Sequence, residues 1–414
     1  MFLSKLYNVF DELGYSRAQG DYGQQFDCYH ASLTYRLEVR QPDQLELAAS
    51  YSDLGICCDR RGQPRQNLEY QILALEIRQR LLNPDHPDLA ESYSRTGMAL
   101  CRTGSAREGL DKQLKALRIL ERQPRPDPLA LASIRTDLAT ICRSLGDMPG
   151  CLNHLLTALK LREDNLPAEH PTLAQAHHNL GVACCETNNW HASRDHYLKC
   201  LQIYRRTLPG SDPRLLRSCA DVAAAYGRLG DHETALEYYL QYLELQREIL
   251  PEYHADLIGA YCRVAEAYGA LGVSTAQMVY LDKAARSGDR ESMRRLGIAL
   301  IRTQTYREGC QWLQLAVEMN DSDAAYALGT FCLSNDGLPR DLNRAVRMLE
   351  LAAARDHGQA HRHLGMLFLG VHPRVPVYPD IDSSRALKHL YRARELGIRG
   401  LDELIRSAEE TLPL

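Results

Sequence analysis

Apolar and small residues recur along the chain at helical spacing, and their pattern repeats with a constant period. Six times between residues 54 and 265 a large residue is followed by Gly or Ala, and each small residue lies 42 positions after the last. One further period back reaches Leu13. A fixed period of this length is typical of a solenoid of stacked helical units. The six pairs are Leu54-Gly55, Thr96-Gly97, Leu138-Ala139, Leu180-Gly181, Val222-Ala223 and Val264-Ala265.

Each period predicts two amphipathic helices joined by a tight turn. The turn position holds Gly or Asn, which adopt the left-handed conformation that ends many helices. These residues are Gly20, Gly62, Gly104, Gly146, Asn188, Gly230 and Gly272. Proline follows the second helix of several units and favours the first turn of a new helix. These prolines, which predict helix starts, are Pro87, Pro128, Pro171 and Pro213.

This pattern of small residues, turn glycines and Ala-rich second helices resembles that of tetratricopeptide repeats. The linker at 85–90, Asp-His-Pro-Asp-Leu-Ala, is similar to that of the 42-residue kinesin-light-chain variety. The resemblance covers residues 1–272. It implies an all-α fold, a right-handed α-α superhelical solenoid of stacked helical hairpins, in which the first helices line a concave groove.

The repeat changes after residue 284. Leu296-Gly297, Leu328-Gly329 and Leu364-Gly365 are spaced 32 and then 36 residues apart, and the turn sequence at 335–341 resembles that of Sel1-like repeats. We therefore expect about seven tetratricopeptide units over 1–284, and about three Sel1-like units with a C-terminal capping helix over 285–414. A longer loop at 371–381 departs from the Sel1-like pattern, and its role is unassigned.

Composition restricts the partners that the chain is expected to bind. It has 49 basic and 53 acidic residues, which favours neither nucleic acid nor an anionic membrane. No apolar run approaches the length of a membrane span, and the charged N-terminal residues argue against a signal peptide. Thirteen cysteines, many at small buried repeat positions, suggest a reducing compartment, so we expect a cytoplasmic protein without a cofactor.

The predicted first helices carry two series of polar residues. Two positions before each small marker residue the side chain is always polar, and arginine recurs four or five residues after it. A groove of this kind can hold an extended peptide, and its arginines can bind carboxylates through bidentate hydrogen bonds. The predicted partner-binding residues are Asp53, Arg95, Asp137, Asn179, Asp221, Arg263, Arg60, Arg102, Arg143 and Arg228, and Asp11 begins the first series.

The alternative interpretation is that these residues are polar because the groove is exposed to solvent. Neighbouring Asp and Arg residues would then pair with each other. The resemblance also implies that asparagines at the first of these positions contact the backbone of a bound peptide, and only Asn179 matches. The Lys/Asn pattern of chaperone-binding repeats is absent.

Histidines and cysteines gather between residues 177 and 200. We expect Cys184 and Cys200 in the core and His191 and His196 on the surface, rather than four ligands around a metal. His361 and His363 are expected on different helix faces.

The sequence thus favours a non-catalytic scaffold or adaptor that binds a peptide or helix of a partner protein. The alternatives are a self-associating structural protein, or an enzyme or metal-dependent sensor that uses the His/Cys cluster.

Overall fold

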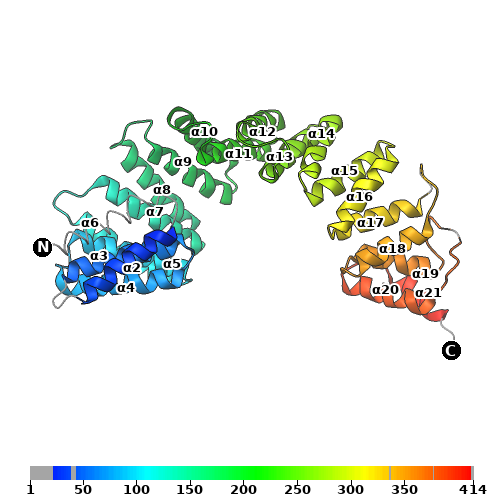
Figure 1. Ribbon diagram of the computed structural model, residues 1–414, viewed down its shortest axis with the longest axis horizontal. Coiled ribbons are helices and arrows are strands. Elements are labelled where there is room, and N and C mark those ends of the chain that lie inside the picture. Colours follow the sequence, from blue (N-terminus) through cyan, green and yellow to red (C-terminus); the bar gives the residue numbers. More distant parts are fainter. Residues whose placement is uncertain (1–21, 39–42, 335–336, 376, 412–414) are drawn as a thin grey trace. The chain divides into compact units, whose positions relative to one another are not determined.

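The computed structural model describes residues 22–38, 43–334, 337–375 and 377–411. These ranges contain twenty α-helices, one short 3₁₀ helix and no strand, so the all-α solenoid of helical hairpins is confirmed (Figure 1). Leu13, Asp11 and Gly20 lie outside the described residues.

The chain divides into two compact units, Met1–Leu229 and Gly230–Leu414. This division does not coincide with the predicted change of repeat type after residue 284, which stays a prediction. In a solenoid each hairpin contacts only its neighbours. The boundary between two compact units can therefore lie at a different residue from the boundary between two types of repeat.

The first described helix of the first unit is α2 (Tyr22–Glu38), and helical hairpins follow it. These hairpins pair α3 (Gln44–Arg60) with α4 (Pro64–Leu81), α5 (Pro87–Arg102) with α6 (Ala106–Glu121), α7 (Pro128–Ser144) with α8 (Met148–Glu163), and α9 (Pro171–Glu186) with α10 (Trp190–Thr207). The unit ends with α11 (Pro213–Arg228). The four prolines that were expected to begin helices each occupy the first turn of one.

The second unit opens with α12 (His232–Arg247) and the 3₁₀ helix η1 (Ala255–Leu257). Its hairpins pair α13 (Ile258–Ala270) with α14 (Ser274–Arg286), α15 (Arg290–Arg302) with α16 (Tyr306–Glu318), α17 (Ser322–Leu333) with α18 (Leu342–Ala353), and α19 (Gly358–Phe368) with α20 (Ser383–Glu395). The last helix, α21 (Asp402–Glu410), packs on α20 and buries Ile405 and Ala408.

The two helices of a hairpin approach closely at the small marker residues. A methyl group on Gly97 of α5 would lie 2.9 Å from the carbonyl oxygen of Gly109 in α6. A methyl group on Gly109 would lie 2.5 Å from the carbonyl oxygen of Gly97. The large residue of each marker pair fills the core instead, as the fully buried Leu54, Leu138 and Val264 illustrate. The small residues therefore set the spacing between the paired helices.

The turns that follow the first helices adopt the left-handed conformation that the glycines predicted. The φ angles of Gly62, Gly104, Gly146, Gly230 and Gly272 lie between 71° and 95°, and Asn188 follows with a φ of 57°. A left-handed residue lets the chain leave one helix and enter the next within a few residues.

We expect Gly146→Ala to lower the free energy of unfolding by about 1 kcal/mol, because an alanine at a φ of 79° is strained although no atom lies near its methyl group. Urea denaturation followed by circular dichroism measures this effect. Asn188→Gly, at the equivalent turn, is the control and should cause no loss. Equal unfolding midpoints for Gly146→Ala and the wild-type protein would contradict the prediction.

Candidate functional site

The structure places the first predicted series on the first helices α3, α5, α7, α9, α11 and α13. Asp53, Arg95, Asp137, Asn179 and Asp221 are partly buried, whereas Arg263 is exposed. Arg263 belongs to the second compact unit, where its guanidinium lies 5.8 Å from the centre of the Tyr242 ring.

Several residues of this series connect neighbouring first helices. Ser94 donates its hydroxyl to Asp137 Oδ2 at 3.2 Å, and His178 Nε2 lies 3.1 Å from Asp221 Oδ2. Arg95 donates to Ser52 Oγ at 2.7 Å. In each pair the two residues are 43 positions apart. Part of the series therefore stabilises the stacking of repeats.

The arginine series makes the same kind of contact. Arg102 forms an ion pair with Asp59, and Arg143 Nη1 lies 3.6 Å from Glu186 Oε1, again between adjacent first helices. Arg228 is exposed, and its guanidinium lies 5.5 Å from the centre of the Trp190 ring. Arg60 is exposed at the end of α3. The side chains of Arg102 and Arg143 remain about half exposed despite their acidic partners.

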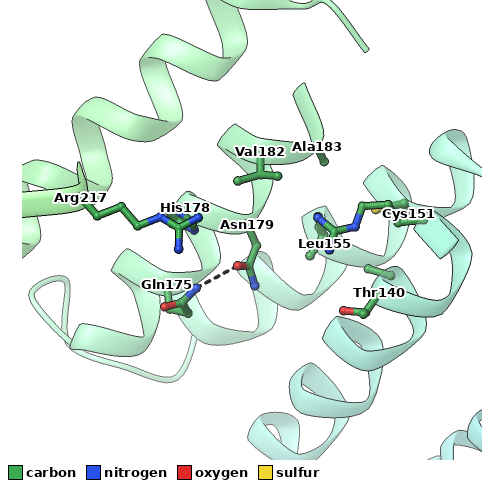
Figure 2. Close-up of a pocket in the computed structure, with 11 residues that line it drawn as sticks. Thr140, Cys151, Leu155, Gln175, His178, Asn179, Val182, Ala183 and Arg217 are labelled. Atoms are coloured by element: carbon green, nitrogen blue, oxygen red, sulfur yellow. Dashed lines mark hydrogen bonds between the residues drawn. The ribbon is translucent and has the colours of Figure 1, made fainter. Parts of the chain in front are cut away.

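A pocket of about 300 Å³ lies among α7, α8, α9 and α11 of the first unit (Figure 2). It brings together two of the predicted residues, Arg143 and Asn179. The remaining lining residues are Ala139, Thr140, Cys151, Leu155, Gln175, His178, Val182, Ala183 and Arg217. The pocket thus combines small apolar residues with cationic and amide groups.

The polar groups of this pocket are held by their own helices. Gln175 Nε2 donates to Asn179 Oδ1 at 2.9 Å, one helical turn away (Figure 2). Arg217 Nε lies 3.8 Å from Asp221 Oδ2, and the Arg217 side chain is 70% exposed. His178 is mostly buried, and its Nδ1 atom has no hydrogen-bond partner among the described residues. The pocket therefore offers two accessible guanidinium groups, whereas the His178 Nδ1 atom is buried.

Gln175 and Arg217 line the pocket but are not among the predicted partner-binding residues. Both stand four positions before a residue of the first series, Gln175 before Asn179 and Arg217 before Asp221. Residues four apart share one helix face, so this spacing is the signal that would have found them.

The Asp137 carboxyl group is partly buried, and it contacts the neighbouring first helix through Ser94. Burial raises the pKa of Asp137 to about 6, although the Ser94 hydroxyl donates a hydrogen bond to it. Its ionised form is therefore costly in the folded protein, and this argues against a simple role as a ligand contact.

The His/Cys cluster differs in one respect from its prediction. Cys184 and Cys200 are buried and His191 is exposed, as expected. The prediction that His196 is exposed is wrong, because its Nδ1 lies 3.1 Å from His177 Nδ1 across the α9–α10 contact. Burial lowers the pKa of His177 to about 4 and raises the pKa of Cys200 to about 12. Within the described ranges, no three His, Cys, Asp or Glu side chains converge on a metal site.

Comparison with protein families identifies both types of repeat. Models of the tetratricopeptide repeat match residues 47–88, 130–206 and 216–249, and a model of the Sel1 repeat matches 322–357 and 359–398. The chain therefore contains tetratricopeptide repeats followed by Sel1 repeats, as predicted. These matches do not distinguish the 42-residue kinesin-light-chain variety.

The chain is also similar to several solved helical-repeat structures. Nearly identical TPR-like repeats from Podosopora anserina, named after kinesin light chain, match with 20% identity and a TM-score of 0.45 over 49% of this chain and 96% of that one. BtubC from P. vanneervenii matches with 18% identity and a TM-score of 0.45 over 60% and 91%. The apo form of RapI matches with 15% identity and a TM-score of 0.47 over 70% and 99%.

A comparison with curated proteins finds no match. None of the described helices combines the length and the apolarity that crossing a membrane requires.

We expect Asp137→Asn to stabilise the protein at about pH 7.5 by on the order of 1–2 kcal/mol, with little effect at about pH 4. The pKa of Asp137 is about 6 in the folded chain and its ordinary value is 3.8, so the folded state binds more protons and loses stability as pH rises through this window. Asparagine keeps an oxygen that accepts from Ser94.

Urea denaturation at both pH values measures this difference. Asp195→Asn, at an exposed site on α10, is the matched control. An equal effect of Asp137→Asn at the two pH values would show that the buried charge is not the cause.

Proposed function

We propose that this protein is a non-catalytic scaffold that binds an extended peptide segment of a partner protein along its first helices. The observation that carries the proposal is the pocket among α7, α9 and α11, where Arg143 and Asn179 from the two predicted series meet. Tetratricopeptide and Sel1 repeats present long surfaces of stacked helices, which suit extended ligands. We take the first-helix face as the concave groove that the resemblance implies.

The polar groups of the pocket suit a peptide that carries an acidic side chain. Arg143 and Arg217 reach it from different helices, and a guanidinium binds a carboxylate through two parallel hydrogen bonds. The amide groups of Gln175 and Asn179 offer a donor and an acceptor to a peptide backbone. Small apolar residues such as Ala139 and Val182 leave room for the bound chain.

The acidic neighbours of both arginines favour a ligand of mixed charge. Glu186 lies 3.6 Å from Arg143 and Asp221 lies 3.8 Å from Arg217, distances at which an ion pair on the surface contributes little. A carboxylate of the ligand can therefore replace these contacts, while Glu186 and Asp221 attract basic residues next to it. We infer a partner segment with both acidic and basic side chains.

The pocket holds no paired nucleophile and base among its described residues. His178 is hydrogen bonded to Asp221, while the Thr140 hydroxyl donates to the carbonyl oxygen of Thr136 in its own helix. A nucleophilic hydroxyl or thiol needs contact with a base to be activated. This arrangement favours binding over catalysis.

A library of peptides displayed on phage, selected against the full chain, tests the proposal. The wild-type protein should enrich peptides that contain Asp or Glu. The double variant Arg143→Glu/Arg217→Glu should bind the selected peptides about tenfold or more weakly, because like charges then face each other.

The double variant Arg65→Glu/Arg107→Glu is the control for net charge, because it makes the same change at exposed positions of the second helices α4 and α6. It should bind like the wild type, and circular dichroism should show equal helix content in all three proteins. Equal loss of binding in both double variants, or no enrichment of acidic peptides, would overturn the proposal.

A further inference from the structure

The Sel1 part of the second unit contains two histidine pairs that share helix α19. His361 Nδ1 lies 2.9 Å from His389 Nδ1 of α20, and His363 Nδ1 lies 2.9 Å from His372 Nε2. His372 belongs to the segment after α19, at the start of the loop that departs from the Sel1-like pattern. His361 is 9% exposed and His372 is 3% exposed. In each pair a buried imidazole is in direct contact with a half-buried one, and this contact needs a defined arrangement of protons.

The hydrogen bonds determine the tautomers of the second pair. The backbone N–H of Arg374 donates to His372 Nδ1 at 3.2 Å, so that nitrogen carries no proton. The proton of neutral His372 is then on Nε2 and is donated to His363 Nδ1. His363 in turn carries its proton on Nε2, which lies 3.3 Å from the Tyr326 hydroxyl of α17. The result is a relay with one direction, from Arg374 through both imidazoles to Tyr326.

The pair between α19 and α20 has an equally defined arrangement. His361 Nε2 lies 3.1 Å from the carbonyl oxygen of Ala353, which can only accept, so His361 carries its proton there. His361 Nδ1 must then accept from the protonated Nδ1 of His389. Both histidines of this pair are neutral as well, and the Phe368 ring is stacked on His389 at 5.8 Å between ring centres.

The surroundings of both pairs disfavour an additional proton. Burial lowers the pKa of His363, His372 and His389 to about 4, and it also lowers the pKa of His361. The negative charge of Asp356 acts in the opposite direction and raises the pKa of His361. His357 is stacked on Tyr326, and its Nε2 lies 3.4 Å from Asp323. It lowers the pKa of His363 further. The cations that face the pairs are Arg340, Arg362, Arg374, Arg385, Lys388 and Arg392.

We propose that the relay from Arg374 through His372 and His363 to Tyr326 is an acid-sensitive latch, which holds residues 371–375 on α19 at neutral pH and releases them on acidification. A proton added to His372 Nδ1 would face the N–H of Arg374. A proton added to His363 Nδ1 would face the N–H of His372. Either proton breaks one bond of the relay. Release uncovers Val375, which is 1% exposed while the latch is closed.

The pH window follows from the direction of the pKa shifts. An ordinary histidine has a pKa of 6.5, and in the closed latch the values for His363 and His372 are about 4. The closed form therefore binds fewer protons than the released form, so it is most stable above pH 6.5 and weakens as pH falls towards 4. Each histidine contributes about a tenfold change in the opening equilibrium per pH unit inside this window.

Amide hydrogen exchange of the full chain, measured by mass spectrometry, tests the latch. The peptide that carries Arg374 and Val375 reports on it directly, since the Arg374 amide donates to His372 Nδ1 and the Val375 amide donates to the His372 carbonyl. After correction for the intrinsic pH dependence of exchange, protection of this peptide should fall by about a hundredfold or more between pH 7.5 and pH 4.5. The double variant His363→Gln/His372→Gln should lose this dependence, because amide side chains do not titrate there.

His191→Gln is the matched control, because it removes an exposed histidine from α10 in the first unit and should leave the pH dependence unchanged. If this peptide of the double variant already exchanges without protection at pH 7.5, ¹⁵N NMR of the wild-type protein tests the latch instead, because it reports the tautomer and the pKa of each histidine. The latch requires a proton on Nε2 of His372 and a pKa below about 5. A pKa near 6.5 for His363 and His372 would overturn the latch. Constant protection of the peptide in the wild-type protein across the pH range would also overturn it, as would an equal pH-dependent loss of protection in the double variant.

Discussion

The packing of each hairpin depends on small residues where its paired helices cross, and in two hairpins the backbones themselves meet there. Gly97 and Gly109 exclude a methyl group from each other's position, and Gly297 and Gly309, also twelve residues apart, do the same in the second unit. Such contact is compatible only with a short turn, and the left-handed residue after each first helix provides it. The core is therefore assembled from small residues at the crossing points and large ones between them.

The next level of organisation is the contact between successive first helices. Polar pairs 43 residues apart, such as Ser94 with Asp137 and His178 with Asp221, connect neighbours across the stack. Of these side chains, Asp137 and Asp221 belong to the series whose periodic polarity suggested a ligand surface. They also stabilise the stack itself, so a substitution in this series affects the repeat interface as well as any bound peptide. Arg143 and Arg217 differ because both remain accessible although each has an acidic neighbour.

The fold could be predicted from the sequence because it follows from local rules that recur with the period. Small marker residues, turn glycines and helix-starting prolines each report on one position of one unit. The pocket could be predicted only in part, because its walls come from three consecutive first helices and a second helix. Asn179 was expected from its position in the series, but the contribution of Arg217 depends on the stacking of α9 and α11.

The partial burial of His196 was missed for a similar reason. Its place on α10 suggests the surface, but the partner that covers it, His177, stands nineteen residues earlier on the facing helix. A pattern confined to one helix does not report the side chain that faces it. The same limit applies to His372, whose role depends on an acceptor on α19 and on the amide of Arg374.

The constant offset of the polar pairs has a consequence for how such a chain changes length. Between residues 54 and 265, duplicating or removing one complete unit of 42 residues leaves each remaining first helix with a neighbour at the same offset. Inserting a single residue within a first helix instead rotates the following side chains by about 100° and separates them from their partners on both sides. Whole units are therefore the natural increments of growth for this architecture, and the interiors of the first helices are the places least tolerant of a shift in register.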